Sequence, residues 1–185
     1  MVATPTAARP THYSSTAKIL HWFVAAAVIT LIPEGLTMKR LIPEGPTRES
    51  LYDFHEALGA LVLIFMVLRL ARRLIFGVPP PEPYLPPADK WASLASQYAL
   101  YALLFIVPLL GWAGTNAYGD PVSVFGLFTF PMILGKDQPL SDEIIVWHLA
   151  GALLVAAIVT LHVAGALFHR LIKHDGVLAR MLPWG

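Results

Sequence analysis

The sequence predicts an all-α integral membrane protein, a single domain over residues 1–185 folded as a four-helix bundle. Three observations lead to this prediction: 56% of the 185 residues are hydrophobic, only 14% are charged, and four long stretches are almost free of charge. A soluble domain is usually about a quarter charged. With 13 basic and 12 acidic residues, mostly between the apolar stretches, the four amphipathic helices of a soluble bundle are hard to build.

The first two stretches must include flanking residues to reach the length of a membrane span. The first is uncharged over residues 19–33 and extends to a helix over about 17–38. The second is uncharged only over residues 57–68. It reaches the roughly 20 residues that a span requires when its helix runs over about 52–76, past Arg69.

The last two stretches are long enough on their own. Residues 91–119 and 144–169 contain no Asp, Glu, Lys or Arg. They predict helices over about 91–117 and 143–170. Prolines and glycines in the intervening segment, 120–142, predict turns and a short surface helix.

Lysines and arginines predict the orientation in the membrane. Nine lie on the side that carries both chain ends, and four lie on the other side. The positive-inside rule then places both termini in the cytoplasm, with membrane lipid around the helices. For a bacterial source, the host would be the inner membrane. The nine are Arg9, Lys18, Arg69, Arg72, Arg73, Lys90, Arg170, Lys173 and Arg180.

Composition also restricts partners and cofactors. The formal net charge of +1 gives no global basic field for binding nucleic acid. The absence of cysteine excludes disulfides, thiolate metal sites, iron–sulfur clusters and thioether-linked haem. The seven histidines are therefore the main candidate metal ligands.

Four histidines lie inside or at the edge of the expected spans: His21, His55, His148 and His162. His148 and His162 are 14 residues apart on one helix, so they share a face and lie about 21 Å from each other. The direction of each span pairs His21 with His162 near the inner side and His55 with His148 near the outer side. Two facing imidazoles at each level can hold the iron of an inner and an outer haem.

Glycines three or four residues after three of these histidines support the same interpretation. Gly59, Gly151 and Gly165 lie on the histidine face of their helices, where a flat macrocycle needs clearance. Ordinary close packing of helices in lipid is the alternative explanation for such glycines.

Short motifs are spread over almost the whole chain. They are His21-Trp22, Phe54-His55-Glu-Ala-Leu-Gly59, Val67-Leu-Arg-Leu70, Val124-Phe-Gly-Leu127, Trp147-His148, Leu161-His-Val-Ala-Gly-Ala-Leu-Phe-His169 and Asp175-Gly-Val-Leu-Ala-Arg-Met-Leu-Pro183. Together these motifs resemble the bacterial cytochrome b561 family. The resemblance implies a four-helix protein with two haem b groups that exchanges electrons with quinone. Some members of the family are superoxide oxidases, which pass electrons from superoxide to ubiquinone.

Three more residues near the inner side are candidates for the site. Arg69 can pair with a haem propionate, or it can snorkel to the headgroups. His169 lies seven residues after His162 and projects from nearly the same face, where it can bind a quinone carbonyl, relay protons or be an ordinary interfacial histidine. Within the family resemblance, His169 is the best quinone-site candidate and Lys173 a weaker one.

Three functions are consistent with these observations. The first is a quinone-dependent oxidoreductase, similar to superoxide oxidase, that takes single electrons from an outer-side donor such as superoxide and reduces ubiquinone. The second is an electron-carrier subunit that links the quinone pool to a periplasmic redox partner. The third is a haem-free membrane protein that uses its histidines for metal or protons, although it lacks the carboxylate clusters expected beside ion paths.

The charge of the outer loops bears on the first of these functions. Four basic residues, Lys39, Arg40, Arg48 and Lys136, can attract an anion such as superoxide. Acidic residues share the same loops, so the outer surface is not plainly positive. They are Glu34, Glu44, Glu49, Asp53, Asp120, Asp137, Asp142 and Glu143.

Overall fold

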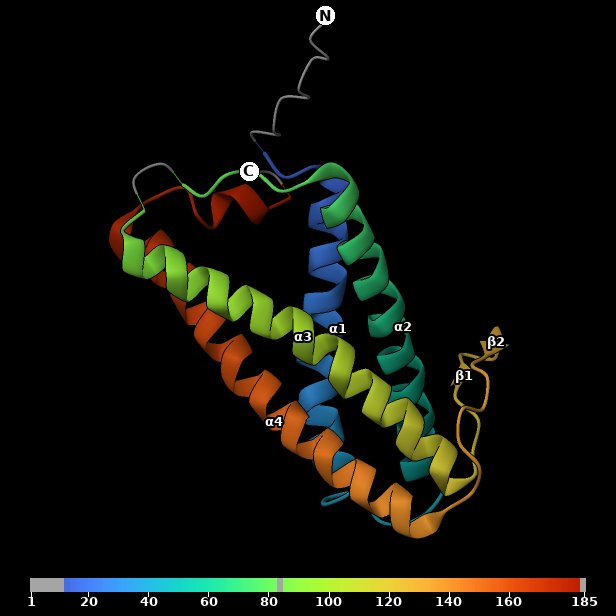
Figure 1. Ribbon diagram of the computed structural model, residues 1–185. Coiled ribbons are helices and arrows are strands. Elements are labelled where there is room, and N and C mark those ends of the chain that lie inside the picture. The colour runs from blue at the N-terminus through green and yellow to red at the C-terminus, as the bar shows by residue number, and fades with distance from the viewer. Residues whose placement is uncertain (1–11, 83–84, 184–185) are drawn as a thin grey trace, which may run out of the picture.

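The computed structural model describes residues 12–82 and 85–183, and four long helices dominate it (Figure 1). The helical fold class is therefore as predicted. A π-helical turn, His169–Lys173, continues the last helix, and a 3₁₀ turn, Ala179–Met181, follows near the end. The helices are α1 (Ser15–Met38), α2 (Pro46–Phe76), α3 (Pro87–Tyr118) and α4 (Gln138–Phe168).

Three helices begin at least four residues earlier than the apolar pattern predicts, and α3 is one of them, starting at Pro87 instead of about residue 91. Helix α2 starts at Pro46 instead of about residue 52, and α4 starts at Gln138 instead of about residue 143. Both starts carry helix-initiation signals, because Pro46 occupies the first helical turn and the Asp137 side chain accepts the Leu140 N–H at 3.1 Å. Polar first turns extend these helices beyond the apolar stretch.

The segment between α3 and α4 forms a small hairpin, not the short surface helix expected from the sequence. Strand β1 (Ser123–Val124) pairs antiparallel with β2 (Phe128–Thr129). The connecting turn places Phe125 and Gly126 at φ values of 51° and 72°; Gly126 adopts this conformation without strain, whereas it is uncommon for a residue such as Phe125. Val124 is buried in a cluster with Ala60 of α2, so the hairpin is held against the bundle.

The helices pack in sequence order, α1 on α2, α2 on α3 and α3 on α4, with much less contact between α1 and α4. The start of α1 and the end of the chain meet at one end of the bundle, where Trp22 Nε1 donates to the Met181 carbonyl oxygen at 2.8 Å (Figure 1). We call this the terminal end. The opposite end, from which the hairpin leaves, is the loop end. Which end faces the cytoplasm stays a prediction, and Arg9, which contributed to it, lies outside the described residues.

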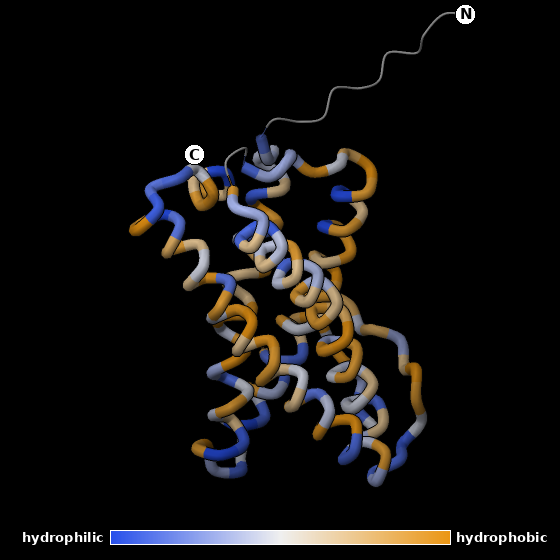
Figure 2. The backbone as a smooth tube through the Cα atoms, turned by 60° about the vertical axis from the view of Figure 1, so that its left-hand side comes forward, coloured by the Kyte–Doolittle hydropathy of each residue, from blue (hydrophilic) through white to orange (hydrophobic). Residues whose placement is uncertain are grey.

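Three helices, α1, α3 and α4 with its π-helical turn, are long and apolar enough to cross a membrane. Helix α2 is not among the three, so its span stays a prediction, supported by its position between α1 and α3. Apolar residues are frequent along the helices (Figure 2), and many large ones are exposed, such as Val146 at 64% and Leu161 at 70%. A surface of this kind suits contact with lipid.

Candidate cofactor sites

The structure brings the four histidines of the helices together in two pairs. His21 of α1 faces His162 of α4, with ring centroids 6.5 Å apart. His55 of α2 faces His148 of α4, with ring centroids 6.1 Å apart. We call the first pair the terminal site and the second the loop site, after the ends of the bundle near which they lie.

Both separations fit a metal held between two imidazoles. Metal–nitrogen bonds of about 2.0–2.1 Å on opposite sides of one ion place the two ring centroids roughly 6–6.5 Å apart. No group of three or more metal-binding side chains occurs within residues 12–82 and 85–183. A pair of histidines therefore suits a metal that brings its own equatorial ligands, as haem iron does.

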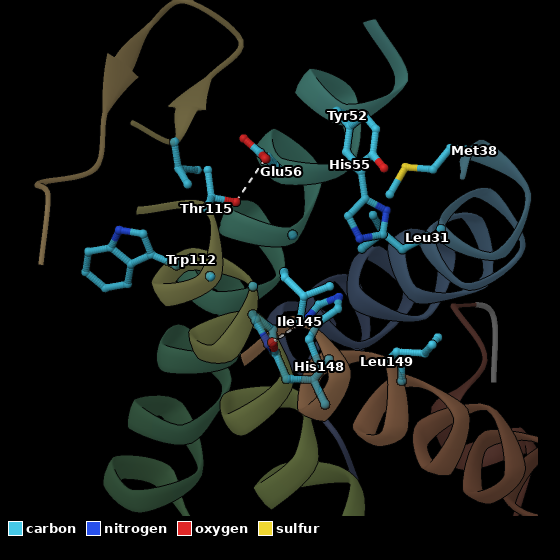
Figure 3. A pocket seen from close by; sticks show the side chains of 18 of the residues that line it. Leu31, Met38, Tyr52, His55, Glu56, Trp112, Thr115, Ile145, His148 and Leu149 are labelled. Atoms are coloured by element: carbon cyan, nitrogen blue, oxygen red, sulfur yellow. Dashed lines mark hydrogen bonds between the residues drawn. The ribbon is translucent and has the colours of Figure 1, made fainter. Parts of the chain in front are cut away.

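A large cavity at the loop end contains the loop site. It measures about 1210 Å³ and is lined by residues of all four helices, with His55 and His148 on its wall (Figure 3). Typical small-molecule pockets have volumes of about 300–1,000 Å³. Gly59 also lines the cavity, and a Cβ atom added there would meet no atom within 4 Å. The space and the missing side chain suit a large, flat group.

The neighbouring helices come unusually close to the two rings of the loop site. A Cβ atom on Gly35 of α1 would lie 3.0 Å from His55 Cε1, and one on Gly111 of α3 would lie 3.2 Å from His148 Cε1. His148 Nδ1 donates to the backbone carbonyl oxygen of Val107 at 2.9 Å. The α3 backbone thus fixes the His148 ring, and the α1 backbone at Gly35 packs closely against the His55 ring.

The three glycines predicted to give clearance differ in their surroundings. Gly59 and Gly165 face open space, as the prediction requires. Gly151 does not, because a Cβ atom there would lie 2.7 Å from Val107 Cγ2. Gly151 therefore serves close packing of α4 on α3, which was the alternative explanation.

The buried side-chain atoms without a hydrogen-bond partner gather at the two sites. In the described part of the chain they are both carboxyl oxygens of Glu34, Nδ1 of His55, and Nε and Nη1 of Arg69. A buried polar group without a partner costs free energy, so such groups are rare and often belong to functional sites.

Arg69 belongs to the terminal site. Its charge acts on both His21 and His162, and its guanidinium carbon lies 5.7 Å from the centre of the Tyr101 ring. Because Nε and Nη1 are buried, the head group does not extend freely to water. This favours pairing with an anionic group over simple snorkelling.

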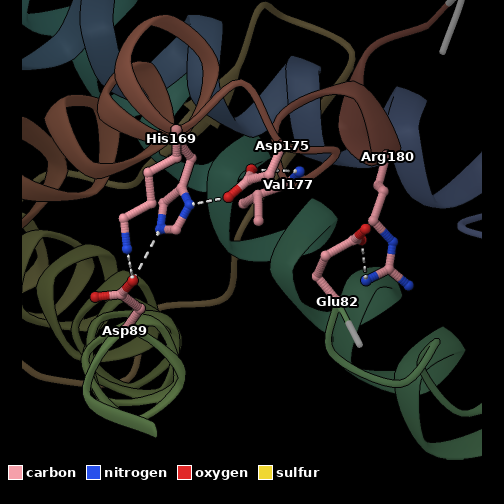
Figure 4. Close-up of polar contacts among 7 residues, drawn as sticks. Glu82, Asp89, His169, Asp175, Val177 and Arg180 are labelled. Atoms are coloured by element: carbon pink, nitrogen blue, oxygen red, sulfur yellow. Dashed lines mark hydrogen bonds and ion pairs between the residues drawn. The ribbon is translucent and has the colours of Figure 1, made fainter. Parts of the chain in front are cut away.

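His169 lies at the terminal end between the carboxylates of Asp89 and Asp175 (Figure 4), and Lys173 pairs with Asp89 beside it. His169 Nδ1 donates to Asp175 Oδ2 at 2.5 Å, and its Nε2 is 4.0 Å from Asp89 Oδ2. Lys173 Nζ donates to the same oxygen of Asp89. The His169 side chain is only 12% exposed, so it is more enclosed than a simple interfacial histidine.

The environment of Asp175 fixes its charge. Burial alone would raise the pKa of this carboxyl, but hydrogen bonds from His169 and from the Val177 N–H, at 3.1 Å, hold the pKa below its usual value. Asp175 therefore remains an acceptor for the His169 ring at neutral pH.

No sequence pattern marks Glu34, Asp89 or Asp175 as part of a site. Asp175 was present only in a family motif, and its closeness to His169 depends on the π-helical turn between them. Asp89 is 84 residues from Lys173 and had no local signal. His12 and His174, which are not part of either pair, are exposed.

Comparison with known proteins gives matches along nearly the whole chain. A family model described as prokaryotic cytochrome b561 matches residues 12–184. The chain is 31% identical over 173 residues to cytochrome b561 homolog 2 of Escherichia coli, covering 94% of this chain and 92% of the relative. It is 29% identical over 172 residues to cytochrome b562 of Cereibacter sphaeroides, covering 88% and 90%. It is 25% identical over 164 residues to probable superoxide oxidase CybB of Yersinia pestis, covering 89% and 92%.

Proposed function

The chain belongs to the prokaryotic cytochrome b561 family, and from this premise we propose that it is a di-haem b, quinone-dependent oxidoreductase. Family membership implies a membrane electron-transfer protein that binds haem b. In the proposal, His21 and His162 ligate one haem iron, and His55 and His148 ligate the other. The observation that carries the proposal is the presence of two facing histidine pairs, with centroids 6.5 and 6.1 Å apart, at two levels of the bundle.

The residues around each pair fit this role. Haem b held by two histidines would supply one-electron transfer and would leave no iron position open to oxygen. The Val107 carbonyl holds the proton of His148 on Nδ1, which leaves Nε2 as the ligand atom. Gly59 and Gly165 leave room beside the histidines. Arg69 offers a buried positive charge to a propionate at the terminal site.

We place the quinone at the terminal end, with ubiquinone as the electron acceptor. Reduction of a quinone to quinol takes two electrons and two protons. Lys173 Nζ is a donor that can bind a carbonyl oxygen, and His169 Nε2 can donate to it and deliver a proton when the ring carries a proton on both nitrogens. Asp89 and Asp175 hold these two side chains in place and are the nearest groups from which their protons can be exchanged.

We place the electron donor at the loop end, and superoxide is the donor suggested by the name of one relative, probable superoxide oxidase CybB. Two superoxide anions would each give one electron, and the products would be two O₂ and, with two protons, one quinol. Lys39, Arg40 and Arg48 line the loop-end cavity and would attract the anion. Glu44 and Glu49 line it too, so the attraction is weaker than in a purely basic funnel.

The alternative function, an electron carrier for a periplasmic redox protein, is favoured by a different observation. The hairpin at the loop end exposes Phe125 at 50%, Leu127 at 81% and Phe128 at 48%. Exposed apolar residues of this kind are typical of protein contacts. A stable stoichiometric complex with a periplasmic redox protein would support this alternative.

The proposed setting is the bacterial inner membrane, with the terminal end in the cytoplasm. Lysines and arginines gather at that end, as the positive-inside rule requires. The quinone site would then face the cytoplasmic leaflet, and the donor would arrive from the periplasm.

The first experiment measures haem b per chain in the detergent-purified protein by the pyridine haemochrome assay. We expect two haem b groups per chain. Protein that contains no haem, although it was made with ample haem, would instead support the haem-free alternative. The second experiment measures ubiquinone reduction driven by an enzymatic superoxide source, with superoxide dismutase as the control. Two haems that superoxide does not reduce would favour the carrier function.

A further inference from the structure

The sequence Leu-Ile-Pro-Glu-Gly occurs twice, at 31–35 and 41–45, and its two glutamates have opposite environments. The Glu34 side chain is 10% exposed, and both of its carboxyl oxygens are buried without a hydrogen-bond partner. The Glu44 side chain is 92% exposed and pairs with Arg48 at 3.5 Å. Glu44 lies at the cavity lining but is open to solvent beside Arg48, whereas the position of Glu34 requires an explanation, because burying an unpaired carboxylate is costly.

Glu34 lies against one histidine of the loop site. Its Oε2 is 3.4 Å from Nδ1 of His55, and this nitrogen is also buried without a partner. The next residue, Gly35, has no side chain to keep the α1 backbone away from the ring. A hydrogen bond between nitrogen and oxygen usually measures about 2.7–3.2 Å, so a small movement of either side chain would complete one. The Glu34 carboxylate and His55 Nδ1 can therefore each supply the hydrogen-bond partner that the other lacks.

We propose that Glu34 is a positioning residue of the loop site, whose carboxylate accepts the Nδ1–H of His55 and lowers the redox potential there. This inference rests on the proposed function, because it takes His55 Nε2 as the iron ligand. A neutral imidazole that binds metal through Nε2 carries its one proton on Nδ1. A carboxylate acceptor fixes the ring and makes it a more basic ligand, which stabilises the oxidised iron. The negative charge of Glu34 acts in the same direction.

The terminal site has the opposite buried charge. Arg69 interacts electrostatically with His21 and His162, and a nearby positive charge favours the reduced state. Glu34 at one site and Arg69 at the other therefore order the two potentials, with the loop site lower. Electrons then run downhill from the loop end to the terminal end, which is the direction that quinone reduction at His169 requires.

The test compares Glu34→Gln with Glu44→Gln, the matched change in the second copy of the motif. Each holoprotein is titrated potentiometrically with its haem absorbance as the readout. The His148→Ala protein identifies which of the two potentials belongs to the terminal site. We expect Glu34→Gln to retain two haems and to raise the loop-site midpoint potential while the terminal-site potential stays unchanged. Glu44→Gln should change neither.

Each other outcome has a defined meaning. Two haems with unshifted potentials in Glu34→Gln would overturn the role of Glu34 and leave the histidine ligands standing. Fewer than two haems in the unmodified protein would instead overturn the proposed function. Should Glu34→Gln lose haem, Glu34→Asp keeps the charge and is expected to retain a low loop-site potential; a raised potential in Glu34→Asp would contradict the proposal. In the unmodified protein, a loop site with the higher potential would contradict the proposed order.

Discussion

The Nδ1 atom of His148 lies 2.9 Å from the backbone carbonyl oxygen of Val107, which joins α4 to α3 at the loop site. A carbonyl oxygen only accepts hydrogen bonds, so Nδ1 carries the proton and Nε2 keeps its lone pair. The fold thereby selects the tautomer that a metal ligand needs. His148 is thus oriented by backbone, whereas His55 opposite it has a carboxylate as its neighbour.

Replacing His148 with alanine should remove only the loop-site haem, and replacing His21 with alanine should remove only the terminal-site haem. Each change deletes one of the two proposed axial ligands of one iron. The expected haem content falls from two per chain to one in each variant, measured by the pyridine haemochrome assay with optical spectra. His174→Ala, at an exposed position, is the control and should keep both haems.

The double variant sharpens this test. A protein with both His148→Ala and His21→Ala should bind no haem while its helices still form, as circular dichroism would show. Spectra that retain two haems after either single change would disprove the ligand assignment.

Gly111→Ala should weaken the loop site without touching a proposed ligand. The added Cβ atom would lie 3.2 Å from both Cε1 and Nδ1 of His148, which is tighter than ordinary contact. The ring must shift, and this disturbs its hydrogen bond to the Val107 carbonyl oxygen. We expect the substitution to lower stability by about 1–3 kcal/mol, as at other overpacked positions. The measurement is the haem content after a chase with a haem-binding competitor. Gly135→Ala, where the new atom meets nothing within 4 Å, should behave as the unmodified protein.

The pairing of the histidines was predictable from the sequence because it depends only on periodicity and on the alternation of the spans. His148 and His162 are 14 residues apart, so any straight helix places them on one face. The direction of the first two spans then determines which partner lies at which depth. Gly35 and Gly111 were not predictable in the same way. Their importance depends on which neighbouring helix each one faces, and that follows from packing.

The polar side chains that contact the candidate site residues likewise could not be predicted from the sequence. Glu34 was grouped with the outer loops although it lies within the predicted first helix, and its closeness to His55 follows from the packing of α1 on α2. Asp89 meets Lys173 only because α3 begins as far back as Pro87 and α4 continues through a π-helical turn. Neither contact can be recognised from composition or residue spacing, because each joins residues that are far apart in the chain.

Asp175→Asn should destabilise the protein at neutral pH, and the difference from the unmodified protein should vanish in acid. The pKa of Asp175 is lowered in the folded state, so its stabilising contribution is complete above the pKa of the unfolded chain, about 3.9, and is lost as the pH falls through the folded pKa. The side chain is 25% exposed, so we expect a contribution of about 1 kcal/mol or less at pH 7. Thermal unfolding in detergent between pH 7 and pH 3 measures it.

The control for this pH dependence is Glu143→Gln, an exposed carboxylate near the other end of α4. It should show no comparable loss at pH 7. A difference between Asp175→Asn and the unmodified protein that grows as the pH falls below 4 would have the wrong sign and would contradict the role given to the His169–Asp175 hydrogen bond.

His169→Asn should leave both haems in place and slow quinone reduction. The side chain is seven residues from the nearest proposed ligand, and its contacts are Asp175 and Asp89, so haem binding does not depend on it. Loss of a positioned proton donor typically costs about 10²–10⁴-fold in rate. The measurement is the rate of ubiquinone reduction by pre-reduced protein, with His174→Asn as the control. Both variants should give the same haem content, so the comparison isolates the quinone step. Equal quinone-reduction rates in the two variants would remove His169 from the quinone site, and the exposed Lys173–Asp89 pair would then be the remaining candidate at the terminal end.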